Sequence, residues 1–124
     1  MANRDYNRKQ ALEREVKEIY AEISIGAAGA PTLNTSYSTG VASISRTSAG
    51  LYVLTLQDAY SHLMHANVDV ASAAAQDLVS QSVSDSVNSA KTYTFRTVTS
   101  AVETDPSSGS TLRVALQLKN SSVR

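Results

Sequence analysis

Two histidines that lie three residues apart are the side chains whose types and spacing come closest to a metal site. His62 and His65 can place both imidazoles on one side of a turn, and Asp58 or Asp69 can supply a third ligand. A zinc ion needs at least three such protein ligands in tetrahedral geometry. Because two histidines alone do not make a site, we interpret them as surface or interface residues. At an interface, their protonation at about pH 6 would weaken the contact.

Other stretches that resemble chemical motifs lack residues that the chemistry needs. Gly26 and Gly29 are not followed by the Gly-Lys-Ser/Thr ending of a phosphate-binding loop, so they predict a turn or hinge. The abundant Ser and Thr are not matched to a histidine and an acid in a recognisable nucleophile motif. The glycosylation sequons that begin at Asn34 and Asn120 are interpreted as chance matches. We therefore expect no enzymatic activity, no cofactor and no metal.

The balance of charge argues against several classes of partner. The 124 residues include 11 Lys and Arg and 11 Asp and Glu, whereas proteins that bind nucleic acid normally carry a basic excess. No segment has the roughly 18 apolar residues that span a bilayer. The polar N-terminus lacks the apolar segment of a secretory signal, and there is no cysteine for a disulfide or a thiolate site. We expect synthesis in the cytoplasm, with no nucleic-acid and no membrane partner.

The elements that would position functional residues divide at about residue 22. Residues 1–22 carry ten of the chain's 22 charged residues and predict an amphipathic α-helix, an N-terminal helical arm ahead of a β-domain over 23–124. Apolar residues recur in this segment at helical spacings of four, three and four, which is one stripe of a helix. The stripe consists of Leu12, Val16, Ile19 and Ile23, with Tyr20 beside them.

These five stripe residues are the predicted interface of the arm. An isolated helix of this length is marginal in water, so another surface must cover its apolar side. Burying such side chains contributes about 1.5–3 kcal/mol each before conformational entropy is subtracted. The covering surface is either the β-domain of the same chain, or a neighbouring subunit or a different protein. The residues leave both possibilities open.

The remainder of the chain carries the alternation and turn signals of strands. The clearest hairpin joins residues 41–47 to residues 51–56 through a short loop that contains Gly50. The cleanest alternation belongs to the last strand, over 111–118, and predicts a core face made of Leu112, Val114, Leu116 and Leu118.

Two further strands are predicted over 65–73 and 91–102, whereas residues 74–90 are interpreted as an irregular connector or a weak strand. Short strands with Gly and Pro turns between them are typical of two-layered or barrel-shaped β-proteins. The predicted fold class is therefore mainly β: an antiparallel β-sandwich or small barrel, jelly-roll-like, with one N-terminal amphipathic α-helix.

Four stretches in this order resemble small structural proteins of tailed-bacteriophage virions, of the capsid decoration or cement type. They are MANRDYNRKQALEREVKEIY, ISIGAAGAPTL, GVASISRTSAGLYVLTLQDAY and DPSSGSTLRVALQLKNSSV. The resemblance implies a non-enzymatic protein that is present in many copies and is usually a homo-oligomer, often a trimer. It supplies no catalytic residues.

From this resemblance we expect a decoration protein that binds the major capsid protein on the outer surface of the shell and stabilises the particle. The alternative is a receptor- or glycan-binding module of a fibre or tail, because similar stretches occur in those virion parts. In that alternative, the candidate residues for stacking on a sugar are Tyr37, Tyr60 and Tyr93.

Overall fold

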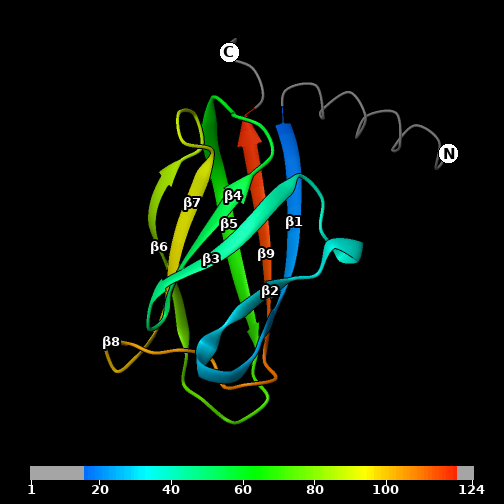
Figure 1. Cartoon of the computed structure of the whole chain (residues 1–124). Coiled ribbons are helices and arrows are strands. Elements are labelled where there is room, and N and C mark those ends of the chain that lie inside the picture. The colour runs from blue at the N-terminus through cyan, green and yellow to red at the C-terminus, as the bar shows by residue number, and fades with distance from the viewer. Residues whose placement is uncertain (1–15, 120–124) are drawn as a thin grey trace, which may run out of the picture.

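The computed structural model describes residues 16–119, which form two antiparallel sheets (Figure 1). The first sheet has the strand order β2-β1-β9-β5, and the second has the order β3-β4-β7-β6, with β8 paired to β7. The bounds are β1 Val16–Ile25, β2 Pro31–Leu33, β3 Val41–Ser48, β4 Leu51–Leu56, β5 His62–Ala71, β6 Val79–Ser86, β7 Thr92–Thr99, β8 Val102–Glu103 and β9 Thr111–Lys119. Two 3₁₀ turns, η1 (Ala27–Gly29) and η2 (Thr35–Tyr37), flank β2.

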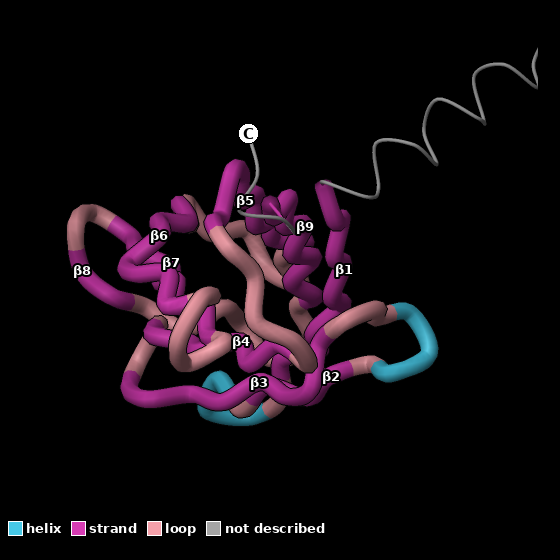
Figure 2. The backbone as a smooth tube through the Cα atoms, turned by 90° about the horizontal axis from the view of Figure 1, so that it is seen from above, coloured by secondary structure: helices cyan, strands magenta, loops and turns pink. Residues whose placement is uncertain are grey.

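The mainly β, antiparallel prediction is confirmed. The described strands form two separate sheets and do not close into one barrel. Seen from above, the sheets face each other across a common core, and β5 lies beside β6 at one side of the molecule (Figure 2). Within residues 16–119, no helix combines the length and the apolar content needed to cross a membrane.

The inward side chains of both sheets make one hydrophobic core. All four of the predicted core residues of β9 are at most 2% exposed, as their alternation indicated. On the second sheet, Phe95 lies between two tyrosine rings, with ring centroids 5.7 Å from Tyr52 and 5.9 Å from Tyr93. Such stacked aromatic pairs contribute about 0.5–1.5 kcal/mol beyond the area that they bury.

The predicted β3–β4 hairpin is confirmed, and its turn depends on Gly50. The φ angle of this residue is +72°, which glycine adopts without steric cost. A Cβ atom there would lie 2.6 Å from the backbone nitrogen of Thr104 and 2.7 Å from the carbonyl oxygen of Thr97. The hairpin can therefore pack this closely against the β7–β8 region only with glycine at its tip.

The predicted helix is wrong over residues 16–22, because these residues belong to β1. Strand β1 pairs with β9 from Val16 opposite Lys119 to Ser24 opposite Thr111, so the boundary expected after residue 22 falls inside a strand. The apolar pattern fits both periods: Ile19 and Ile23 are four apart, yet with Ala21 and Ile25 they also alternate. Pairing with a distant strand decides between the two. The predicted helix over residues 1–15, including Leu12, lies outside the described residues.

The segment whose interpretation was open, 74–90, contains β6 at the edge of the second sheet. Its serine-rich sequence resists helix formation, and pairing with β7 supplies the hydrogen bonds that it needs. The structure therefore resolves this segment as a connector followed by an edge strand.

Candidate functional site

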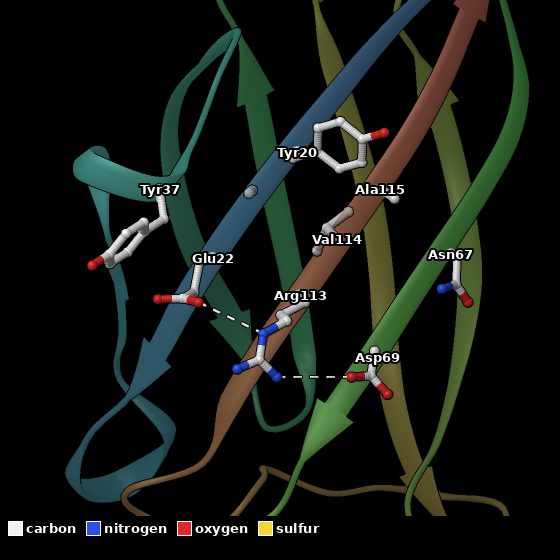
Figure 3. A pocket seen from close by; sticks show the side chains of 9 residues that line it. Tyr20, Glu22, Tyr37, Asn67, Asp69, Arg113, Val114 and Ala115 are labelled. Atoms are coloured by element: carbon white, nitrogen blue, oxygen red, sulfur yellow. Dashed lines mark ion pairs between the residues drawn. The ribbon is translucent and has the colours of Figure 1, made fainter. Parts of the chain in front are cut away.

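An open groove lies on the outer face of the first sheet (Figure 3). We name this face, formed by the outward residues of β1, β9 and β5, the β1–β9–β5 face. The groove has a volume of about 370 Å³. Its lining residues are Tyr20, Ala21, Glu22, Tyr37, Asn67, Asp69, Arg113, Val114 and Ala115.

Strand register explains why the groove forms where it does. Ala115 of β9 lies opposite Tyr20 of β1 on one side and opposite Asn67 of β5 on the other. Residues opposite one another across strands point to the same face. The short Ala115 side chain therefore lies between the Tyr20 ring and the Asn67 amide. The floor of the groove is therefore low at its centre and taller at both sides.

The next row along the same strands is a ladder of charges. Arg113 lies opposite Glu22 and Asp69, with Nε 3.6 Å from a Glu22 oxygen and Nη1 3.9 Å from an Asp69 oxygen. Glu22 also accepts a 3.0 Å hydrogen bond from Nδ2 of Asn34. Exposed ion pairs of this kind contribute little to stability, about 0–1 kcal/mol, so the ladder chiefly orients the planar groups.

Two exposed tyrosines border the groove. Tyr20 is 49% exposed on β1, and Tyr37 is 70% exposed on η2. The η2 segment is bound to β1, because the Thr39 N–H donates to the Tyr20 carbonyl and the Glu22 N–H donates to the Ser38 hydroxyl. The backbone that carries Tyr37 is thus fixed beside the sheet although the ring itself is exposed.

The other two candidate stacking residues are unavailable for binding. Tyr60 and Tyr93 are buried in the core, and the Tyr93 hydroxyl is hydrogen-bonded with Ser82. Burial raises the pKa of both phenols above the ordinary value. Only Tyr37 of the three predicted residues lies at a surface where a ligand can stack.

The five predicted interface residues separate into different environments. Ile19 and Ile23 point inward and are buried in the core of their own chain. Tyr20 belongs to the β1–β9–β5 face, and Val16 lies opposite Lys119 at the end of the same sheet. Leu12 lies outside the described residues. A strand places neighbours on opposite faces, so the structure separates residues that a helical stripe would hold together.

A second exposed feature is the edge strand β6. Among the described strands, β7 alone pairs with β6; β5 lies along the other side without ladder hydrogen bonds, and the Ser80 hydroxyl donates to the Val68 carbonyl there. Val79 and Val83 are 58% and 42% exposed, and Asp85 is the only charged side chain of the strand. A register shift between Ser82 and Ser84 makes Val83 a bulge. Bulges and charges are common ways of protecting a sheet edge, and here the stretch before the bulge carries neither.

The two histidines lie on β5. His62 is opposite Lys119 and His65 is opposite Gln117, and both side chains are exposed. Within residues 16–119, no group of three His, Cys, Asp or Glu side chains is arranged to hold a metal ion. Their surface position agrees with the first interpretation of these residues.

The strongest electrostatic cluster is structural. Asp105 accepts hydrogen bonds from Arg46, at 3.0 Å from Nε and 2.7 Å from Nη2, and from the Gly50 N–H at 2.7 Å. Tyr52 lies beside it, with its hydroxyl 3.0 Å from the Gly29 carbonyl and 3.3 Å from Asp105. A Cβ atom on Gly29 would lie 2.3 Å from the Asp105 carboxyl carbon, so this glycine makes room for the acid.

The ionisation of this cluster follows from its contacts. The hydrogen bonds from Arg46 have the largest effect and hold the pKa of Asp105 below its ordinary value; burial opposes them, and the Gly50 N–H lowers the pKa further. Burial, with the neighbouring Asp105 charge, raises the pKa of Tyr52 far above that of a free phenol. Both groups are thereby held in one protonation state at neutral pH, which suits an anchor and not a proton-transfer pair.

Sequence reasoning missed Arg113, Asp69 and Asn67 as groove residues. The alternation of β5 and β9 placed each of them on a polar face, but no local signal tells which strands are neighbours. Comparison of the chain with protein-family models, with curated proteins and with solved structures finds no match.

Proposed function

We propose that the protein is a non-enzymatic structural protein of a tailed-phage virion, which binds the outer surface of the capsid shell and stabilises it. The stretches quoted above carry the resemblance on which this proposal rests. The β6 edge is the observation that supports a docking role, because a sheet edge with exposed valines and little charge is a template for another chain.

In the proposed complex, an extended segment of the major capsid protein adds a strand beside β6. Pairing along Val79–Ser82 would satisfy the backbone groups that have no ladder partner, would replace the hydrogen bond from the Ser80 hydroxyl to the Val68 carbonyl of β5, and would end at the bulge at Val83. The two valines would lose their contact with water in the same step. Each fully buried valine contributes about 1.5–3 kcal/mol, which is enough for a weak individual contact.

Many such contacts act together on a shell. We propose that several copies of the chain, with a trimer as the favoured arrangement, bind the major capsid protein at neighbouring positions. Linked sites increase the apparent affinity without new contacts. Light scattering of the purified full chain measures the number of chains in each oligomer. A monomer at all concentrations would contradict the proposed oligomer.

Replacing both Val79 and Val83 by lysine should lower the affinity of the protein for virus particles from which the native protein is missing. We expect a loss of about tenfold or more, because two charges would have to enter a paired, dehydrated edge. Fold retention is expected, since both side chains are exposed. Met64→Lys is the matched control: Met64 is 53% exposed but lies on β5 of the other sheet. Co-sedimentation with particles gives the measurement, and equal loss in both proteins would reject the β6 edge.

The stabilising role has its own test. Particles without the protein should disassemble at lower temperature or under milder osmotic shock than complete particles, and adding the protein back should restore them. Unchanged particle stability would reject the cement role while leaving shell binding open.

A receptor-binding module of a fibre or tail is the second candidate function. The observation that favours it is Tyr37, a ring 70% exposed on a segment fixed beside a groove. Labelled electron microscopy of the virion separates the two, because label on the shell supports the first and label confined to the tail or fibres supports the second.

A further inference from the structure

The β1–β9–β5 face lies on the sheet opposite to the one that contains β6, and its groove has no part in the proposed shell contact. A volume of about 370 Å³ falls in the range of small-ligand sites, roughly 300–1,000 Å³. The groove includes Tyr37, which the second candidate function uses, and its ligand is set by its own lining residues.

The groove combines an aromatic border with planar polar groups. The rings of Tyr20 and Tyr37 supply apolar surface, whereas Asn67, Asp69 and Arg113 supply donors and acceptors from neighbouring strands (Figure 3). A tyrosine ring is rigid and costs little entropy to order in a contact. The amide, carboxylate and guanidinium groups each present two or more hydrogen-bonding atoms in one plane.

The ion pairs leave these polar groups partly available. The closest approaches of Arg113 to Glu22 and Asp69 are 3.6 and 3.9 Å, longer than a strong charge-assisted hydrogen bond of about 2.7–2.9 Å. Arg113 and Asp69 are 56% and 63% exposed. A ligand with hydroxyl groups can therefore bond to both residues while the ladder keeps their planes in place.

The charge of the groove selects among ligands. Glu22 and Asp69 are two acids against the single base Arg113, so an anionic ligand is disfavoured. A purely apolar ligand would remove water from the exposed charged row without offering it any new hydrogen bond. A pyranose sugar meets both requirements, since its C–H face is apolar and its hydroxyl edge donates and accepts hydrogen bonds. We propose that this groove binds one or two neutral or amino-bearing pyranose units of a glycan.

Saturation-transfer difference NMR on the full chain tests the proposal with three named probes. Maltotriose is neutral, chitosan trisaccharide is cationic, and a heparin-derived tetrasaccharide is anionic. We expect saturation transfer to the ring protons of one or both of the first two, with a dissociation constant on the order of 1 mM because the groove is shallow and open. Transfer to the anionic probe alone, or to none, would overturn the proposal.

Variants locate the binding. Tyr37→Ala and Ala115→Arg should each weaken binding at least tenfold, the first by removing a stacking ring and the second by filling the centre of the groove. Tyr37→Phe should bind within about twofold of the original protein, because the ring is retained. Val102→Ala, an exposed change on β8 of the second sheet, is the control. Thermal unfolding of each variant checks its fold, and sugar binding that survives in both folded groove variants would place the ligand elsewhere.

Discussion

Ile19→Ala should lower the free energy of unfolding by about 2–5 kcal/mol, whereas Tyr20→Ala should lower it by less than about 1 kcal/mol. Ile19 is 1% exposed between the sheets, and its loss leaves a cavity that the surrounding side chains fill only in part. The Tyr20 side chain points to the outer face and is 49% exposed, so its removal takes away few buried contacts. Denaturant unfolding followed by circular dichroism measures both values.

This pair of variants tests whether residues 19 and 20 belong to a strand or to a helix. On a helical stripe, adjacent residues at the edge of one face would both be covered, and both substitutions would be costly. On β1 they lie on opposite faces, so one substitution should be costly and the other mild. Similar losses in the two variants would contradict the strand assignment or show that the outer face is covered by another copy, and repeating the measurement at lower protein concentration distinguishes these outcomes.

Asp105→Ala should have the second large effect, a loss of about 2–3 kcal/mol of stability at neutral pH. The carboxylate accepts hydrogen bonds from Arg46 of β3, from the Gly50 N–H of the β3–β4 turn and from the Tyr52 hydroxyl of β4, which also donates to a carbonyl of η1. Its removal leaves a Gly50 N–H and a guanidinium without their partner, and hydrogen bonds to charged groups contribute about 1.5–3 kcal/mol. We expect a loss of only about 2–3 kcal/mol because Asp105 is partly exposed, and solvent weakens its charge interactions. Thermal and denaturant unfolding at pH 7 measure the loss.

The same residue predicts a pH dependence with a defined sign. The pKa of Asp105 is lower in the folded protein than in the unfolded chain, where a carboxyl titrates at about 3.9. Its contribution to stability is therefore complete above that unfolded value and is lost as the pH falls through the folded pKa. Asp105→Asn should unfold with a flatter pH dependence below about pH 5. Asp69→Asn, which changes an exposed and distant ion pair, is the matched control and should keep the original slope.

The strands that were predicted correctly are those whose signals are local. In β9, every second residue is a large aliphatic side chain, and no helical spacing competes with that alternation. In the β3–β4 hairpin, a glycine at a positive φ angle stands between two β-rich runs. These features lie within a few residues of one another, so the sequence alone was sufficient to predict them.

Strand β1 could not be assigned in the same way. Its apolar residues satisfy a period of two and a helical period, and its charged residues favour an exposed helix. The deciding fact is the pairing of Ile19 with Leu116 and of Ile23 with Leu112. That pairing joins segments at the two ends of the described chain, and no local pattern contains it.

The functional residues were partly predictable for a similar reason. Tyr93, predicted as a stacking residue, shares its face of β7 with Phe95 and is buried with it, so the alternation was compatible with burial as well as with stacking. Arg113, Asp69 and Glu22 become one row only when β9 lies between β5 and β1. No local signal marked Asp105 as an anchor, because its partners come from β3 and β4.

The central position of β9 has a consequence for how the protein is made. The ribosome releases the other strands first, yet β1 and β5 have no shared neighbour until residues 111–119 emerge. Until then Ile19 and Ile23 lack the leucines that cover them, and long-range pairing of this kind folds slowly. The first sheet is therefore expected to fold only after β9 has emerged. Chains that stall before residue 111 expose unpaired strands and should be cleared by proteases or aggregate.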